Sequence, residues 1–345
     1  MTLHANGLSR PVPLSLNAKR VQLLAYIAWL RGETVNRDRL LEQIFGHGRS
    51  DEEATREKLG EAFDSHKKLI RWDLREAISK LNEEAGKEVM PPDLDIFAHR
   101  QRLYRLSEVC RVVDLQAIEA QHQVIEQARK EGLLVESVPE QIKQACERLL
   151  AAYPGDFLEE LITDYLDDFE PWVSSWARKP YTLYRDYYLQ ALWYAAEYEL
   201  RTGQQLTGDP GAEGEEKRRQ QRKHWNRAAQ LYRTYAMSAC SNRFDTKVTF
   251  GGPGRESGER VVMSERALRR SLVLYGATGA THLVDQVYTA YYKHMRSLSA
   301  KSWEPSKETL KDLESAKEQT SAYRFPRQVT PHELPPHPLE MADHG

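Results

Sequence analysis

The sequence predicts a mainly α-helical protein with two parts: a smaller N-terminal part that ends in a β-hairpin, and a larger part that is all-helical. Three observations support this prediction. Apolar residues recur at helical spacing between residues 67 and 85. Two short strand-like segments follow the pair of prolines at positions 91 and 92. From Val113 to about residue 200 the apolar pattern keeps the period of a helix.

The N-terminal part is expected to begin with a short strand and two helices. Residues 11–16 are typical of a strand, and their prolines restrict it to the edge of a sheet. Asn17 can cap a helix that ends at about residue 31, and Asn36 can cap a second helix that ends at Phe45. Residues 51–66 are highly charged, and their pattern leaves open whether they are helical or loose.

A third helix and a hairpin complete this part. The helix is expected over residues 67–85. Its apolar stripe consists of Ile70, Leu74, Ala77, Ile78 and Leu81. Residues 94–97 and 102–106 indicate two strands around a turn at 98–101. Three helices followed by such a small β-hairpin wing predict a winged helix-turn-helix.

The larger part is expected to consist of antiparallel helix pairs. Its predicted helices cover residues 113–130, 138–152, 165–177, 178–201, 217–239, 262–277, 280–298 and 306–320. Residues 202–216 and 241–261 are rich in polar residues and glycine, which indicates loops. Paired helices of this kind favour an all-α, tetratricopeptide-like helical-repeat domain, although the match to a repeat consensus is weak.

These patterns divide the chain into three segments. Residues 1–108 form the expected winged-helix domain and residues 109–322 the helical-repeat domain. Residues 323–345 are rich in Pro and His and are expected to be a disordered tail. The formal net charge of −2 hides an uneven distribution, since residues 110–180 hold 7 basic and 14 acidic side chains while residues 201–345 hold 23 and 17. Such a layout suits several partners better than one.

Cysteine and histidine usage gives no indication of an enzyme or a metal protein. Cys110, Cys146 and Cys240 are far apart, no CxxC is present, and no Cys/His group has zinc spacing. No Ser/His/Asp or Cys/His arrangement is detectable. The stretch Gly251-Gly-Pro-Gly254 lacks the Gly-Lys-Ser/Thr of a phosphate loop. We therefore expect no catalytic site, no metal and no cofactor.

The sequence also predicts a cytoplasmic protein. The N-terminus has no basic segment followed by an apolar run, and no stretch of 18 apolar residues exists. Neither a signal peptide nor a membrane span is therefore expected. Scattered thiols without a disulfide framework suit a reducing compartment.

The polar face of the third helix is the first candidate site. Arg71, Arg75, Ser79 and Asn82 follow spacings of 4, 4 and 3, so they share one face. In the major groove, which admits one helix, Arg can pair with guanine and Asn with adenine. With their basic neighbours and the wing, the residues predicted to contact DNA are Lys68, Arg71, Arg75, Ser79, Lys80, Asn82, Arg100 and Arg102. The alternative is a solvated charged face with pairs such as Lys80 and Glu76.

Three further runs leave alternatives open. Residues 156–170 hold seven carboxylates, where a docking surface for a basic partner competes with a solvated acidic face. The basic run at 217–223 indicates either a nucleic-acid contact or a solvated helix start. The aromatic run at 181–198 is expected to be mostly core, and part of it could line a groove for a peptide.

The order of these motifs resembles a known family. Residues 12–106 resemble an OmpR-type winged-helix DNA-binding domain, which typically ends on a strand similar to Tyr104-Arg-Leu106. Residues 110–320 resemble the bacterial transcriptional activator domain. The matching pieces are Val113-Asp-Leu115, Tyr153-Pro-Gly-Asp-Phe-Leu158, Trp172-Val-Ser-Ser-Trp-Ala-Arg178, residues 268–275 and Glu304-Pro-Ser-Lys-Glu-Thr309. In this order the two domains are similar to those of the Streptomyces antibiotic regulatory proteins.

The resemblance implies a sequence-specific, DNA-binding transcription regulator that acts as an activator. It implies double-stranded DNA as the partner of the first domain. For the helical domain it implies self-association as a homodimer or contact with RNA polymerase. The alternative is a protein-protein adaptor that keeps the winged fold without DNA binding, because the third helix ends in the acidic Glu83 and Glu84.

Overall fold

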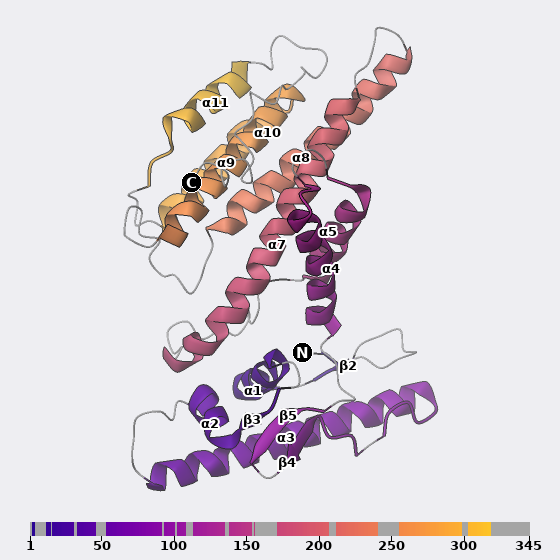
Figure 1. Cartoon of the computed structure of the whole chain (residues 1–345), viewed down its shortest axis with the longest axis vertical. Coiled ribbons are helices and arrows are strands. Elements are labelled where there is room, and N and C mark those ends of the chain that lie inside the picture. Colours follow the sequence, from indigo (N-terminus) through magenta and orange to yellow (C-terminus); the bar gives the residue numbers. More distant parts are fainter. Residues whose placement is uncertain are drawn as a thin grey trace. The chain divides into compact units, whose positions relative to one another are not determined.

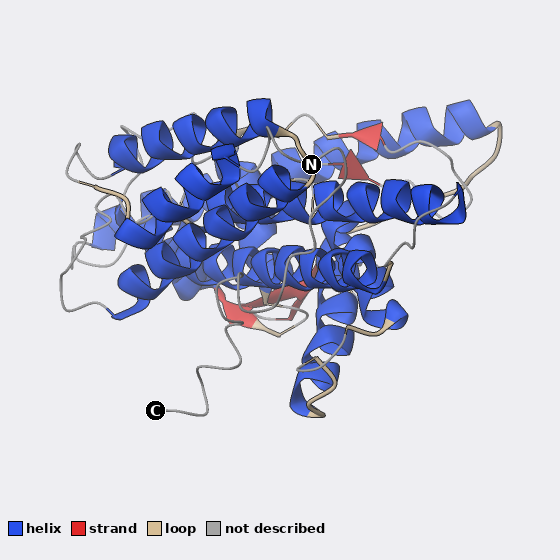
Figure 2. Cartoon of the chain, turned by 90° about the horizontal axis from the view of Figure 1, so that it is seen from above, coloured by secondary structure: helices blue, strands red, loops and turns tan. Residues whose placement is uncertain are grey.

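The computed structural model describes most of the chain, which is mainly helical as predicted (Figures 1 and 2). The described residues are 2–3, 12–14, 16–30, 33–45, 53–91, 93–100, 102–107, 113–134, 138–153, 155, 171–206, 212–240, 255–298 and 303–318. They form two compact units. The first comprises Met1–Val113 with Asp156–Leu183, and the second Asp114–Gly155 with Tyr184–Gly345. The predicted tail at 323–345 lies outside the described residues.

The described part of the first unit combines helices with short antiparallel strands. The helices are α1 (Ala18–Trp29), α2 (Arg37–Phe45), α3 (Glu53–Ala85) and the first part of α7 (Pro171–Gln205). The strands are β1 (Thr2–Leu3), β2 (Val12–Pro13), β3 (Val35–Asn36), β4 (Phe97–Arg100) and β5 (Leu103–Leu106). β1 pairs with β2, and the other three form a sheet in the order β3-β5-β4. In this sheet Val35 lies opposite Tyr104, and Phe97 opposite Leu106.

The elements of this unit differ from the predicted ones in two details, and the structure decides a third point that the sequence left open. The hairpin strands begin at Phe97 and Leu103 rather than at 94 and 102. The Asp95 carboxylate accepts a hydrogen bond from the Phe97 backbone N–H at 3.1 Å, which makes a local turn just before β4. β3 was not predicted because two residues are too few to show alternation. The open segment 51–66 is helical from Glu53.

The core of the first unit lies along one side of α3. Phe63, Ile70, Leu74 and Ile78 are at most 2% exposed and continue a single stripe. The Phe63 ring meets the Tyr104 ring of β5 edge to face, with centroids 5.2 Å apart. Ion pairs and hydrogen bonds connect α3 to α1 and α2. Arg20 of α1 pairs with Asp73, and Arg37 of α2 donates to the Gly60 carbonyl (2.9 Å) and the Asp64 carboxylate (2.6 Å).

The described part of the second unit is all-helical. It contains α4 (Val113–Lys130, from Asp114), α5 (Glu140–Ala152), α7 from Tyr184, α8 (Ala212–Ala239), α9 (Arg255–Ala277), α10 (Thr281–Leu298) and α11 (Lys307–Glu318). α9 packs against α8, α10 and α11, and α10 also contacts α8 and α11 (Figure 1). From α8 to α11, each helix therefore contacts the helix that follows it, and α8 and α9 also contact the one after that. Gly279 makes the tight turn from α9 to α10 possible, since its φ of +75° suits glycine.

The prediction of separate helices at 165–177 and 178–201 is wrong, because α7 runs unbroken through Pro180. Proline inside a helix removes a hydrogen bond and costs about 3 kcal/mol. Pro180 is buried, as are Trp176 and Tyr181 beside it. Trp176 packs edge to face on Tyr26 of α1, with ring centroids 5.0 Å apart. Burial of these apolar side chains offsets the local cost of the proline.

A buried ionic cluster joins three helices of the second unit. Glu197 of α7 and Arg270 of α9 form an ion pair, and the two residues are 3% and 4% exposed. The Tyr232 hydroxyl of α8 donates to the same Glu197 oxygen at 2.6 Å and accepts from Arg270 at 2.8 Å. Burial raises the pKa of Tyr232 well above its ordinary value, so the hydroxyl stays a donor at neutral pH. The guanidinium carbon of Arg270 also lies 5.1 Å from the centre of the Trp193 ring.

A close approach between α7 and α8 lies at the end of α7. A Cβ on Gly203 would come within 2.3 Å of the Trp225 ring. The Trp225 indole N–H donates to the Leu200 carbonyl at 3.3 Å, and the Gln221 amide donates to the Gly203 carbonyl at 3.0 Å. The Gly203 carbonyl lies in the last turn of α7, where intrahelical partners run out, so the bond from Gln221 helps to satisfy it.

We expect Gly203→Ala to lower the free energy of unfolding by about 1–3 kcal/mol, because the rigid, fully buried Trp225 ring has little room to move. The matched control is Gly60→Ala inside α3, where the added methyl group meets only the far end of Arg37 at 3.1 Å. That change should be close to neutral or stabilising by up to about 1 kcal/mol, since alanine favours a helix. Urea unfolding followed by circular dichroism measures both, and equal effects would contradict the assigned contact.

We expect Arg270→Met to lower the free energy of unfolding by about 3 kcal/mol, because it leaves the buried Glu197 carboxylate with Arg201, 3.6 Å away, as its remaining cation. The double variant Glu197→Leu with Arg270→Met should regain part of this loss, because it removes the unpaired charge but leaves the buried Tyr232 hydroxyl without these two partners. Arg269→Met is the control on the same helix. Arg269 pairs with Asp312 at 2.6 Å at the partly exposed rim, so its loss should cost about 1 kcal/mol. Additive effects in the double variant would show that Glu197 and Arg270 are not coupled.

Candidate nucleic-acid interface

The outward face of α3 presents a row of long side chains. Since Phe63, Ile70 and Leu74 fix the inner face, the positions opposite them face away from the core. Lys68, Arg75 and Ser79 all lie on this outward side and are exposed. Within the described part of the chain, no carboxylate pairs with Lys68 or Arg75. Both cations are therefore available to an external anion.

Trp72 stands in the middle of this row and was missed by the sequence analysis. Its side chain is 61% exposed, which is unusual for a large aromatic residue. It lies four residues after Lys68, three before Arg75 and seven before Ser79, so the helical period places it on their face. That spacing was the available signal. The predicted contacts were limited to charged and small polar side chains, which leaves out an aromatic ring. We call Lys68, Trp72, Arg75 and Ser79 the α3 row.

Arg71 lies at the edge of the α3 row and is held by the chain itself. Its guanidinium group forms an ion pair with Asp95, just before β4. Asp95 in turn accepts the hydrogen bond from the Phe97 N–H described above. The structure thus places Arg71 where it links α3 to the hairpin. A contact with a base would require this pair to open.

Asn82, at the other predicted base-contact position, closes the loop after α3. Its side-chain oxygen accepts hydrogen bonds from the backbone N–H groups of Val89 (2.7 Å) and Met90 (3.0 Å). Its amide nitrogen donates to the Met90 carbonyl at 2.8 Å. Three bonds to the backbone fix the side chain, and pairing with adenine would have to break them. The structure does not bring Asn82 together with the α3 row.

Lys80 is exposed but points away from the α3 row. It donates to Glu76, one turn earlier, at 2.8 Å. This hydrogen bond and the nearby charge of Glu76 raise the pKa of Lys80. The pair is the one expected for a solvated helix face. Glu76, Glu83 and Glu84 are all exposed, so the C-terminal half of α3 is more acidic than the half that bears Lys68.

The hairpin contributes one described basic side chain near its turn. Arg102 is exposed, and its carbonyl accepts a hydrogen bond from the Arg37 backbone N–H at the start of α2 (2.9 Å). This bond ties the turn of the hairpin to the first residue of α2. The predicted contact residue Arg100 ends β4, but its side chain lies outside the described residues, as does Gln101.

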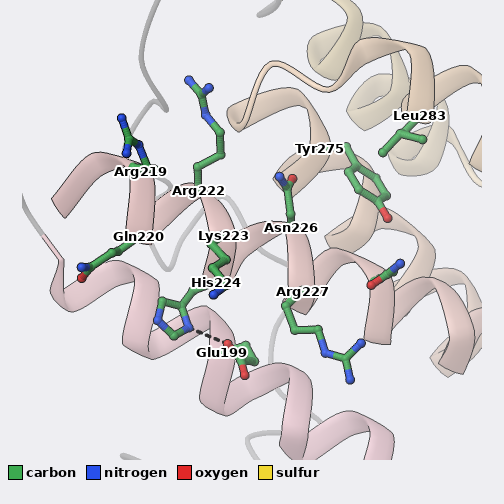
Figure 3. A pocket seen from close by; sticks show the side chains of 11 residues that line it. Glu199, Arg219, Gln220, Arg222, Lys223, His224, Asn226, Arg227, Tyr275 and Leu283 are labelled. Atoms are coloured by element: carbon green, nitrogen blue, oxygen red, sulfur yellow. Dashed lines mark hydrogen bonds and ion pairs between the residues drawn. The ribbon is translucent and has the colours of Figure 1, made fainter. Parts of the chain in front are cut away.

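Other candidates from the sequence have mixed outcomes. The acidic run at 156–170 lies outside the described residues. Within the aromatic run, Tyr181, Tyr184 and Trp193 are buried core residues. The basic run at 217–223 lies on α8 and borders a hollow (Figure 3). Burial raises the pKa of the Cys146 thiol to about 12, so this thiol is protonated and a poor nucleophile at neutral pH.

No group of three or more His, Cys, Asp or Glu side chains in the described ranges could hold a metal ion. In the same ranges no helix is long and apolar enough to cross a membrane.

Comparison with known proteins assigns no family to the chain. Comparisons with models of protein families, with curated proteins and with solved structures found no match for the chain. What can be said of the site therefore comes from the residues themselves. They offer an exposed row with two cations, an indole ring and a hydroxyl group on one helix.

Proposed function

We propose that the chain is a sequence-specific DNA-binding transcription regulator that reads promoter DNA with α3. The observation that carries the proposal is the α3 row, an exposed row of Lys68, Trp72, Arg75 and Ser79 on a helix whose other face is fixed in the core. A helix with such a face fits the major groove, where arginine pairs with guanine and lysine with phosphate or guanine.

The element order supports a winged helix-turn-helix for the first unit. The order α1-β3-α2-α3-β4-β5, with the hairpin directly after α3, is the order expected of such a domain, with α3 as the proposed recognition helix and β4-β5 as the proposed wing. In this arrangement Arg71 and Asn82 position α3 and its following loop. The contacts with DNA are assigned to the α3 row and to Arg102.

The packing of the second unit supports a tetratricopeptide-like domain that binds protein. Helices that touch their next and next-but-one neighbours are the packing pattern of a helical repeat. The partner proposed for this unit is a second copy of the chain or RNA polymerase, as the resemblance implies. A regulator of this kind would act as an activator in the cytoplasm.

A specific observation favours the second candidate function, an adaptor without DNA binding. Glu76, Glu83 and Glu84 make the end of α3 acidic, and tryptophan is enriched at energetically important positions of protein interfaces. On this alternative, Trp72 would be the centre of a protein contact and duplex DNA would bind only weakly.

We expect the double variant Lys68→Glu with Arg75→Glu to weaken binding to duplex DNA from the chain's own upstream region by about 100-fold or more. Each lost phosphate contact should also lower the slope of log affinity against log salt by about 1. Fluorescence anisotropy across a salt series measures both. Lys87→Glu, an exposed site beyond α3, is the control and should keep most of the affinity. Equal loss in the control, or no binding by the unaltered chain at low salt, would favour the adaptor.

We expect Trp72→Ala to weaken DNA binding without a comparable loss of stability. Because the ring is largely exposed, the free energy of unfolding should change by no more than about 0.5 kcal/mol. Affinity for the upstream duplex should nevertheless fall about tenfold, as apolar contact with a base or sugar is lost. Leu69→Ala is the matched control, since Leu69 is 44% exposed on α3 but lies outside the α3 row. A loss of DNA affinity in the Leu69 variant alone would place the contact on another face.

A further inference from the structure

A basic hollow lies over the outward face of α8 in the second unit (Figure 3). It encloses about 990 Å³. Its cations are Arg219, Arg222, Lys223 and Arg227 of α8. Among the described residues that line it, Glu199 of α7 supplies the single carboxylate, while Tyr275 of α9 and Leu283 of α10 add apolar surface. We call this site the α8 hollow.

The fold fixes the cations by fixing the opposite face of α8. Trp225 is fully buried against α7, and Gln221 is bonded to the Gly203 carbonyl. Asn226 accepts a hydrogen bond from the Thr278 hydroxyl at 2.8 Å, which ties α8 to the turn after α9. With these contacts made, Lys223 and Arg227 remain on the outer face. The α8 hollow is therefore set by the same packing that forms the core.

Glu199 does not neutralise the hollow. Its carboxylate lies 2.6 Å from Nδ1 of His224, and Figure 3 shows the His224 ring turned toward it. His224 thus engages Glu199, the one acidic group in the described lining. Of the four basic side chains that line the hollow, Arg219 lies 3.5 Å from Glu216 on the same helix, while Lys223 and Arg227 lie beside the His224–Glu199 pair (Figure 3).

Elsewhere in the described part of the second unit, arginine and lysine side chains commonly lie beside carboxylates. Examples are Arg260 with Asp186 at 3.1 Å, and Lys317 with Asp285 at 2.6 Å. In the α8 hollow, Lys223 and Arg227 contact no carboxylate within the described ranges. Like charges four residues apart on a helix repel each other and destabilise it. An anionic ligand would remove that repulsion.

The size and lining of the hollow indicate the kind of anion. Small-ligand sites usually enclose about 300–1,000 Å³, whereas a DNA duplex needs a long open surface. Arginine binds phosphate through two parallel hydrogen bonds, and lysine through its point charge. Several cations gathered over one small hollow suit a ligand with more than one phosphate group. Leu283 is half-buried and offers an apolar contact for an organic group beside the phosphates, while Tyr275, 2% exposed, lies beneath it in the wall of the hollow.

We propose that the α8 hollow binds an organic polyphosphate, with a nucleoside triphosphate as the representative ligand. Lys223 and Arg227 hold the phosphates, and the wall formed by α9 and α10 contacts the organic group. The site lies wholly in the second unit and goes beyond DNA contact by α3. It stands whether or not α3 binds DNA.

Isothermal titration calorimetry of the full chain tests the site directly. A nucleoside triphosphate and inorganic tripolyphosphate should bind, and the uncharged nucleoside should not. Lys223→Glu and Arg227→Glu should each weaken triphosphate binding at least about tenfold, since each removes a charge-assisted contact. Lys293→Glu, at an exposed position on α10 away from the hollow, is the matched control and should bind as the unaltered chain does. Circular dichroism checks that the variants fold.

Two results would overturn the proposal. One is absence of triphosphate binding by the unaltered chain, or binding that neither Lys223→Glu nor Arg227→Glu weakens. The other comes from DNA titrations in the Arg75→Glu background, where contact by α3 is removed. DNA that still binds there, is released by Arg227→Glu and is not displaced by the triphosphate would make the hollow a nucleic-acid surface instead. If Arg75→Glu abolishes DNA binding, that result concerns the α3 row and does not contradict ligand binding by the α8 hollow.

Discussion

Burial of one ion pair sets the helix packing of the second unit. Glu197 and Arg270 come from helices that lie far apart in sequence, and Tyr232 joins them from a third helix. Two charges removed from water are tolerated only when they meet with good geometry and full hydrogen bonding. A shift of α7, α8 or α9 along its axis would leave one of these groups unsatisfied. The cluster therefore limits the unit to one register.

That register decides what the surface can do. With Tyr232 and Trp225 turned inward on α8, the basic residues at other positions of the helix must face outward. The first unit follows the same logic on α3, where Phe63 and Leu74 turn inward and Lys68 and Arg75 turn outward. In both units the apolar residues that stabilise the fold also orient the charged residues assigned to binding. The two cationic surfaces are distinct, so their ligands can be tested separately.

Much of the fold follows from sequence patterns, whereas the site depends on contacts that patterns do not contain. The apolar stripe between Ile70 and Leu81 predicted the second half of α3, and the strand-like segments at 94–97 and 102–106 predicted a hairpin whose first strand lies three residues later in the structure. The continuity of α7 through Pro180 was not predictable from local rules, because burial of the neighbouring aromatic rings outweighs the proline. The roles of Arg71 and Asn82 depend on Asp95 and on a loop after the helix, and a helical spacing cannot show such partners.

The exposure of Trp72 gives the protein a built-in optical reporter. Trp176, Trp193, Trp225 and Trp303 are buried, so their emission senses a constant, apolar surrounding. Trp72 alone among the tryptophans with a described side chain is mostly in contact with water. Trp29 is half-buried, so among the tryptophans with a described side chain Trp72 is the one that iodide reaches most readily. Any molecule that covers the α3 row changes the quenching by iodide without a dye attached, and a molecule that occupies the α8 hollow leaves it unchanged.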